Sequence, residues 1–225
     1  MRFTALLPMK GVSERVPNKN IRDFNGLPLF FHILKTLISI ENIEKIIINT
    51  DSEIIKKLVA GFDKVVIHER PDYLRGSLIP MNSIIGYDIE KSCDTNFIQT
   101  HSTNPLLKAE TIQSAMHQFE ALKESNDSVF SVSRIQARLY WEDGKPINHK
   151  LTELLRTQDL PSVFEENSNY FIFTANSFTE NGNTRIGKTP LMLEVSKIEA
   201  IDIDEPEDFI IAEAIHKYLN SSIKK

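Results

Sequence analysis

Three cations lie close together near the start of the chain, where residues 9–20 read MKGVSERVPNKN. The groups in this stretch that could contact a ligand are Met9, Lys10, Gly11, Ser13, Arg15, Lys19 and Asn20. A cationic loop with a glycine, placed between a strand and a helix, suits a polyphosphate because side-chain charge and backbone N–H groups converge there. The stretch contains neither the Walker pattern nor GxGxxG. A phosphate site and a solvated cationic loop are therefore both open from these residues alone.

Two aspartates near the other end of the chain could bind a metal ion. Residues 200–209 read AIDIDEPEDF. If this stretch begins as a strand, Asp202 and Asp204 point to one side, and the intervening isoleucines point into the core. Two carboxylates on one face suit Mg²⁺, which prefers oxygen ligands and keeps waters or phosphates in its other positions. The alternative is that Asp204 only caps the helix that follows.

The rest of the chain predicts an α/β sheet that would position these groups. Short apolar runs alternate with helical patterns, as in βαβ units, and the nearly continuous apolar runs suit a mostly parallel sheet covered on both faces. The expected strands are Arg2–Pro8, Lys45–Asn49, Lys64–Ile67, Thr95–Thr100, Ser128–Val132 and Tyr170–Thr174. The expected helices are Pro28–Ile40, Ser52–Ala60, Asn82–Lys91, Ala109–Lys123 and Pro206–Leu219. We expect the last helix to pack on the sheet through residues such as Ile210 and Ile211, before a solvated tail at 221–225.

One irregular region interrupts this alternation. Residues from about 135 to 161 include RLYWEDGKPINHK, with a DG pair typical of a hairpin. We expect one domain over residues 1–225, with this region as a lid or dimer contact. A plain surface insertion is equally compatible with its composition.

Composition excludes several classes of protein. The 225 residues include 26 Lys and Arg against 31 Asp and Glu, a net charge of −5 that argues against a nucleic-acid-binding surface. No apolar run is long enough to cross a membrane, and the start is unlike a secretory signal. The single cysteine, Cys93, cannot form an intramolecular disulfide, and we expect it to be buried. These features predict a soluble cytoplasmic protein.

The first loop also resembles a known family. LLPMKGVSERVPNKNI is similar to the nucleotide-binding signature of the cytidylyltransferases that activate acidic ulosonic sugars, the CMP-sialic acid and CMP-Kdo synthetases. Ser13, Pro17, Lys19 and Asn20 match it, Lys10 replaces the usual arginine, and Arg15 resembles the Kdo branch. The resemblance implies a Rossmann-like nucleotidyltransferase fold with three layers. It also implies a homodimer that exchanges the irregular region.

Further matches extend this resemblance along almost the whole chain. In IQTHSTNPLLKAETI, Thr103 matches a position near the substrate, and His101 is expected to hydrogen-bond a ligand rather than cap a strand. Asp51 and Arg70 match positions near the nucleotide, although Asp51 could instead cap the next helix. The AIDIDEPEDF match makes metal binding the preferred interpretation of its two aspartates.

Two stretches are expected to shape the sugar site. LRTQDLP contains Arg156, whose guanidinium could pair with a sugar carboxylate, and Gln158. EENSN contains Asn167, which matches the family, and His149 is a weaker candidate. Surface or dimer-contact roles remain equally open for all four residues.

The function implied by the resemblance is transfer of CMP from CTP to the anomeric hydroxyl of a sialic-type 2-keto-3-deoxy sugar acid, with release of pyrophosphate. Lys10, Arg15 and Lys19 would hold the triphosphate, and Asp202 and Asp204 would hold Mg²⁺. The partners would be CTP and an acidic sugar, with no nucleic acid and no membrane. The alternatives are a nucleotidyltransferase for another sugar acid or sugar phosphate, and a catalytically silent nucleotide-binding module.

Overall fold

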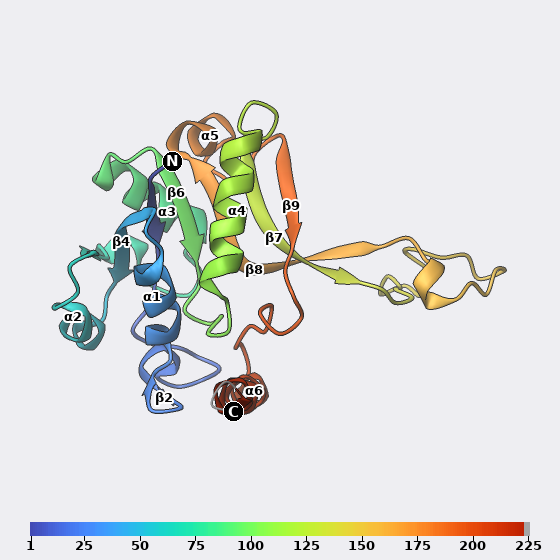
Figure 1. Cartoon of the computed structure of the whole chain (residues 1–225), viewed down its shortest axis with the longest axis horizontal. Coiled ribbons are helices and arrows are strands. Elements are labelled where there is room, and N and C mark those ends of the chain that lie inside the picture. Colours follow the sequence, from blue (N-terminus) through green and yellow to red (C-terminus); the bar gives the residue numbers. More distant parts are fainter. Residues whose placement is uncertain (223–225) are drawn as a thin grey trace.

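A seven-stranded sheet forms the centre of the molecule, for which a computed structural model describes residues 1–222 (Figure 1). Its order is β5-β4-β1-β6-β8-β7-β9. The strands are β1 (Phe3–Leu6), β4 (Ile43–Thr50), β5 (Val65–Glu69), β6 (Asn96–Thr100), β7 (Ser128–Ile135), β8 (Val163–Thr174) and β9 (Pro190–Glu194). Only β8 runs antiparallel to its neighbours, β6 and β7, so the mostly parallel sheet predicted from the sequence is confirmed.

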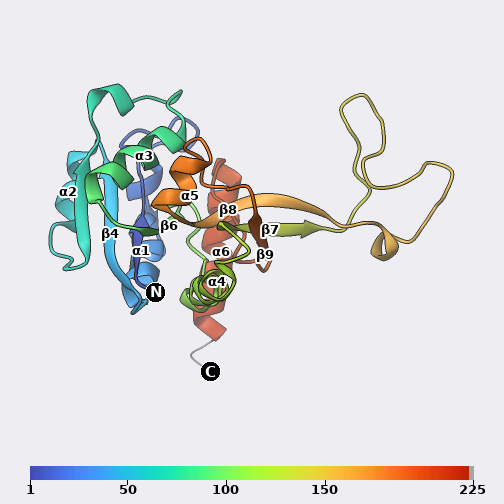
Figure 2. The same cartoon turned by 90° about the horizontal axis from the view of Figure 1, so that it is seen from above.

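Helices cover both faces of this sheet (Figure 2). The helices are α1 (Phe30–Ser39), α2 (Glu53–Val59), α3 (Met81–Ser92), α4 (Ala109–Leu122), α5 (Ala175–Glu180) and α6 (Pro206–Ser222). Apolar side chains of α1, α2 and α4 share one buried cluster with Ala5 and Ile46, whereas α3 and α5 share a second cluster with Leu6 and Ile47. Successive residues of β1 and β4 thus enter opposite clusters, which explains their nearly continuous apolar sequence. The predicted three-layer α/β fold is confirmed.

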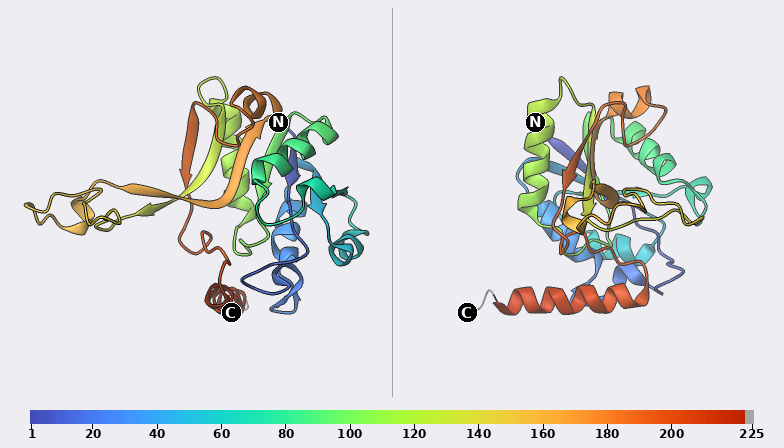
Figure 3. Two further views of the ribbon diagram at one scale, coloured as in Figure 1. Left: turned by 180° about the vertical axis from the view of Figure 1, so that it is seen from behind. Right: turned by 90° about the vertical axis from the view of Figure 1, so that its right-hand side faces the viewer.

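The last helix packs elsewhere than predicted. Phe209 and Ala212 of α6 are buried against Val16, Phe24 and Leu29, beyond the carboxyl edge of the sheet (Figure 3). Phe24 belongs to a small hairpin of β2 (Asp23–Phe24) and β3 (Leu27–Pro28), and its ring meets that of Phe209 edge-on at 5.5 Å. The predicted helix is confirmed, but its predicted packing on the sheet was wrong, because its buried face is the one that carries Phe209.

Ile210 and Ile211 are exposed, because the face that carries Phe209 and Ala212 turns toward the first loop and the hairpin. Of the predicted tail at 221–225, Ser221 and Ser222 still belong to α6, and residues 223–225 lie outside the described residues.

A long extension leaves the sheet between β7 and β8. The two strands continue as a pair from Val132 and Glu166 to Ile135 and Val163, and residues 136–162 then project away from the rest of the molecule (Figure 1). Inside this extension, Asn148 donates to the carbonyls of Ala137 (2.8 Å) and Pro161 (3.1 Å). We call residues 136–162 the arm.

Cys93 is exposed, so its predicted burial was wrong. It follows the last turn of α3 in a left-handed conformation, with φ of 56°, past the residues through which that helix enters the core. None of the helices within residues 1–222 is long and apolar enough to cross a membrane.

Candidate active site

Most of the predicted ligand-binding residues converge at the carboxyl ends of the parallel strands. A cavity of about 230 Å³ lies between the loop after β1, the segment from Arg70 to Ile84, and the residues after β6. The predicted residues that line it are Met9, Lys10, Ser13, Lys19, Asn20, Arg70, His101 and Thr103. These residues come from distant parts of the sequence, and the parallel strand order brings them to one edge of the sheet, where ligands bind in open α/β folds.

The cationic loop is tied to its surroundings at both ends. The N–H of Gly11 donates to Asp51 Oδ1 (2.7 Å), and Asn20 Nδ2 donates to the carbonyl of Lys10 (2.9 Å). Ser102 Oγ donates to Asn20 Oδ1 (2.7 Å), which joins the loop to the residues after β6. Asp51 therefore anchors the loop, and the alternative of a helix cap fails because Ser52 accepts from the N–H of Ile55.

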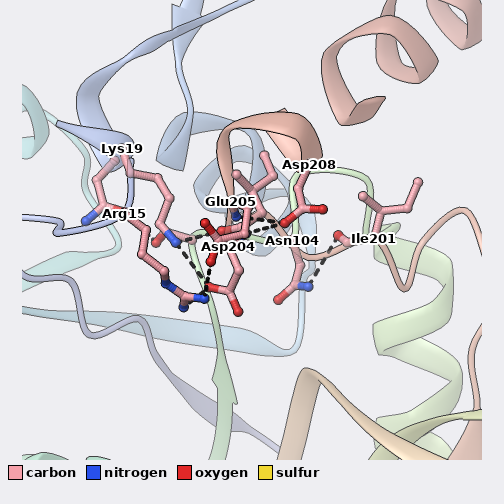
Figure 4. A network of polar contacts seen from close by, with 10 residues as sticks. Arg15, Lys19, Asn104, Ile201, Asp204, Glu205 and Asp208 are labelled. Atoms are coloured by element: carbon pink, nitrogen blue, oxygen red, sulfur yellow. Dashed lines mark hydrogen bonds and ion pairs between the residues drawn. The ribbon is translucent and has the colours of Figure 1, made fainter. Parts of the chain in front are cut away.

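Arg15 and Lys19 lie against the acidic segment that leads into α6 (Figure 4). Arg15 Nη2 is 2.8 Å from Asp204 Oδ1, and Arg15 Nη1 is 2.9 Å from Glu205 Oε1. Lys19 Nζ donates to the carbonyl of Ile203 (2.6 Å) and lies 3.4 Å from Asp204 Oδ1. The hydrogen bond to Glu205 and the charge of Asp204 raise the pKa of Arg15. Two predicted phosphate-binding cations thus lie beside one predicted metal ligand.

The acidic segment is not a strand, which corrects the sequence prediction. Residues 201–204 have no ladder partner within residues 1–222, although the buried Ile203 donates its N–H to the carbonyl of Thr103 (3.0 Å). The capping alternative for Asp204 also fails. It is Asp208, inside the first turn of α6, that accepts from the N–H groups of Asp204 (3.0 Å) and Glu205 (2.7 Å). The carboxylate of Asp204 therefore remains available to cations.

Asp202 lies two residues before Asp204 in the same segment. Its Oδ1 is buried without a hydrogen-bond partner among the described residues. Burial raises the pKa of Asp202, the hydrogen bond with Thr103 opposes the shift, and the charge of Asp204 adds to it. Within residues 1–222 no three potential metal ligands converge, but Mg²⁺ commonly takes only one or two carboxylates and completes its shell with phosphates and water. The donor set therefore fits Mg²⁺.

His101 is held as a neutral imidazole. Its Nε2 is buried with no hydrogen-bond partner within the described part of the chain. Burial, followed by the charge of Arg185, lowers the pKa of His101 to about 4. At neutral pH an uncharged ring that lines the cavity can donate to, or accept from, a ligand.

Arg185 was not predicted from the sequence. Its Nη1 donates to the buried Gln99 Oε1 (2.5 Å), and its guanidinium carbon lies 3.8 Å from the centre of the Phe171 ring. Burial lowers the pKa of Arg185, and Glu166 partly offsets this. No sequence signal distinguishes this single arginine in the polar stretch NGNTRIG, since only the tertiary structure brings it beside β6.

The remaining predicted sugar-site residues separate into two places. Asn167 is buried, donates to Ser133 Oγ (3.1 Å) and lines a hollow together with Asp202 and Asp204. Arg156 and Gln158 lie on the arm, where Arg156 pairs with Asp159 (2.7 Å), and the arm projects away from the cavity (Figure 1). His149 is also on the arm, edge-on to Tyr140. These arm residues therefore do not reach the cavity of their own chain.

A mostly parallel sheet with a cationic loop and paired carboxylates at its carboxyl edge is the arrangement of a nucleotidyltransferase. Residues 4–212 match the family model described as cytidylyltransferase, and the chain belongs to this family of enzymes.

Similar proteins were found by sequence and by structure. The chain is 29% identical over 226 residues to a CMP-N,N'-diacetyllegionaminic acid synthase of Legionella pneumophila, covering 96% of both chains. It is 22% identical to an N-acylneuraminate cytidylyltransferase of Streptococcus agalactiae, covering 93% of this chain and 52% of that protein. The structure of a CMP:2-keto-3-deoxy-manno-octonic acid synthetase complexed with CTP superimposes with a TM-score of 0.70 over 97% of this chain and 99% of the other, at 11% identity.

Proposed function

We propose that the chain transfers CMP from CTP to the anomeric hydroxyl of a sialic-type 2-keto-3-deoxy sugar acid. The hydroxyl oxygen bonds to the α-phosphorus and its proton passes to water, while the bond from that phosphorus to the bridging oxygen breaks and pyrophosphate leaves. The observation that carries this proposal is the contact of Arg15 and Lys19 with Asp204 at the edge of the cavity. Such a reaction depends mainly on charge neutralisation and in-line positioning.

The positions of the cations of the first loop support the proposal that this loop binds the triphosphate. Lys10 and Lys19 line the cavity, and Arg15 pairs with Asp204, which lies 3.4 Å from Lys19. Ser13 and Asn20 add neutral hydrogen-bonding groups from the same loop. Because Gly11 has no Cβ, its backbone can lie close to Ser52. An added Cβ would lie only 3.1 Å from the Ser52 Cβ. We propose that these groups bind the phosphates and orient the α-phosphorus.

Mg²⁺ is the proposed cofactor, held by Asp202 and Asp204. When bound, it would neutralise phosphate charge that the cations of the loop do not neutralise. Lys19 also contributes to this site. Its ammonium group donates to the carbonyl of Ile203, the residue between the two aspartates. Asp204 can then exchange its contact with Arg15 for a contact with the metal while the segment keeps its position.

The carboxylate of the acidic sugar needs a cation near His101 and Thr103. We propose Arg185 for this role because, unlike Arg156 on the arm, it lies next to β6, and because its charge acts on His101. Asn167 borders the adjacent hollow. We propose that Arg156 and Gln158 serve the site of a second copy, since their arm extends away from their own cavity.

The arm supports the proposal of a homodimer. It carries exposed apolar side chains, namely Tyr140, Trp141, Ile147, Leu151, Leu154 and Leu155. Burying these side chains against a second copy would remove a large apolar surface from water. Exchange of arms between two identical chains would bury the apolar side chains of both arms at once. We also propose a cytoplasmic location, where CTP is available.

Release of pyrophosphate tests the activity. Purified protein with Mg²⁺ and CTP is expected to release pyrophosphate only after addition of a suitable acid from a panel that includes neuraminic, legionaminic, pseudaminic and Kdo-type acids. Parallel reactions with UTP, GTP, ATP and sugar phosphates test the alternative nucleotidyltransferases. Binding of CTP without turnover on the whole panel would favour the silent module and contradict the proposed activity.

A further inference from the structure

A second polar cluster lies behind the cavity, between the sheet and α3. It consists of Asn49 on β4, His68 on β5, Arg70 just after β5, and Asp88 on α3, with exposed fractions of 0%, 4%, 4% and 0%. Polar and charged side chains buried to this degree are costly unless they are paired. Of the four, only Arg70 lines the cavity.

The four side chains form one connected network with Asp88 at its far end. Asp88 Oδ1 accepts from Asn49 Nδ2 (2.8 Å) and is 2.8 Å from His68 Nδ1. The other end of the Asn49 amide, Oδ1, accepts from Arg70 Nε (2.8 Å), and the backbone carbonyl of Asn49 accepts from Arg70 Nη2 (2.9 Å). One residue thus holds the guanidinium at two points.

We propose that Asp88 is a positioning residue for Arg70, acting through the amide of Asn49, and that it thereby fixes the guanidinium toward the nucleotide. This inference rests on the proposed function, in which the cavity binds CTP. Asp88 itself does not reach the cavity, so its role is to orient and not to bind.

The donor and acceptor pattern explains why a carboxylate is needed at this place. An amide turned by 180° would present its NH₂ group to Arg70, a side chain that has only donors. Ionised Asp88 has only acceptors, so it selects the orientation in which Nδ2 of Asn49 faces Asp88 and Oδ1 faces Arg70. Burial lowers the pKa of Arg70, and the negative charges of Asp51 and then of Asp88 oppose that shift.

Affinity for CTP provides a test that needs no sugar substrate. Calorimetric titration with CTP and Mg²⁺ is expected to show about tenfold weaker binding for Asp88→Ala, the size of one lost charge-assisted hydrogen bond. In an Arg70→Ala background, Asp88→Ala is expected to cause no further loss, because its effect passes through Arg70. A merely structural role would instead weaken binding equally in both backgrounds, which would overturn the inference.

Asp94 offers a matched control at the opposite end of the strands. Its carboxylate accepts from Lys45 (2.8 and 3.0 Å) and from Thr4 (2.8 Å), with no contact to Arg70. Asp94→Ala is expected to lower thermal stability and to leave CTP affinity unchanged. An equal loss of affinity in Asp94→Ala would show that general destabilisation explains the result, and would overturn the inference.

A reciprocal exchange covers the case in which Asp88→Ala fails to fold. Asn49→Asp places two carboxylates together and should weaken CTP binding. When Asp88→Asn is added, the amide at position 88 can donate to the carboxylate at position 49, and that carboxylate can accept from Arg70. CTP affinity is then expected to recover to within about threefold of the original. No recovery overturns the inference. If Arg70→Ala leaves CTP affinity unchanged, the inference fails while the proposed activity can stand; if the unmodified protein does not bind CTP, both fail.

Discussion

Lys19 and Asp204 are 185 residues apart in the sequence, yet Lys19 Nζ lies 3.4 Å from Asp204 Oδ1 and donates to the carbonyl of the preceding Ile203 (Figure 4). The contact joins the first loop of the sheet to the segment that begins the last helix. Phe24 and Phe209 bring the same two regions together through apolar packing. The cationic and acidic halves of the site are therefore assembled by the docking of α6.

Asp204→Asn is expected to lower kcat by about a hundredfold or more, because a neutral amide neither binds Mg²⁺ as a carboxylate does nor balances Arg15 and Lys19. Steady-state pyrophosphate release with Mg²⁺ and CTP measures the effect. Glu205→Gln is the matched control, since Glu205 also pairs with Arg15 but is not a proposed metal ligand. Activity should stay within about threefold in that control. Similar losses in the two variants would contradict the metal assignment.

Gly11→Ala is expected to raise the KM for CTP several-fold with little change in melting temperature. A Cβ at this position would lie 3.1 Å from the Ser52 Cβ and 3.4 Å from Asp51 Oδ1. The loop would have to shift by a few tenths of an ångström, which disturbs the anchored N–H of Gly11. Gly61→Ala, where an added Cβ meets nothing within 4 Å, serves as the control. Unchanged kinetics in Gly11→Ala would show that the loop backbone does not position the nucleotide.

His101 makes the stability of the protein depend on pH in a defined direction. Burial lowers the pKa of His101 from 6.5 to about 4, so between these values the unfolded chain binds a proton that the folded chain does not. This contribution to stability is fully present above pH 6.5 and is lost as the pH falls toward 4. At pH 5 the loss amounts to about 2 kcal/mol.

Urea unfolding at pH 7 and pH 5 checks this prediction. His101→Asn should remove about 2 kcal/mol from the pH dependence of the unfolding free energy. The exposed His117, on α4, provides His117→Asn as a control with the original dependence. The same slope in all three proteins would mean that His101 titrates alike in the folded and unfolded states.

Trp141, the single tryptophan of the chain, reports directly on the arm. It is 63% exposed in one copy, so dimerisation through the arms should shift its emission to shorter wavelength as protein concentration rises. Leu154→Asp, at an arm residue that is 90% exposed, should suppress both the shift and the larger species in sedimentation. An emission spectrum independent of concentration, together with a monomer in sedimentation, would refute the dimer.

Arg185→Met is expected to raise the KM for the sugar acid about tenfold and to leave CTP affinity unchanged, because methionine keeps the packing on Phe171 but loses the charge. Arg134→Met, at an exposed arginine that donates to Ser162, is the control. A methyl ester of the sugar acid sharpens the measurement. If the variant still prefers the free acid over the ester as strongly as the unmodified protein does, Arg185 does not bind the carboxylate.

The sequence alone was sufficient to predict the helices and strands that have strong periodicity. The apolar runs of β1, β4 and β6 and the helical spacing in α1 and α4 reflect local chemistry, and all five were found within a few residues of their predicted bounds. The cationic loop could be recognised in the sequence for the same reason, since its charged residues are close together along the chain. α5 and β9 were not predicted, because each is short and lacks a clear pattern.

Long-range contacts could not be derived from local patterns. An alternation of Ile and Asp at 201–204 predicts a strand, yet the backbone of Ile203 bonds to Thr103, which is not part of a strand. Similarly, α6 has apolar residues on more than one side. Its buried side is decided by Phe24 and Val16, which belong to a distant part of the chain.

The sequence by itself determined the kinds of groups available: a loop with three cations, a pair of aspartates, and enough apolar periodicity to build a mostly parallel sheet. The tertiary structure decided which of them meet. It placed Lys19 beside Asp204, brought Arg185 into contact with Gln99 of β6, buried Asp88 behind Arg70 and carried Arg156 away on the arm. The physical reason is that composition and spacing fix local charge and periodicity, whereas contacts between distant residues depend on strand order and on the face each helix buries.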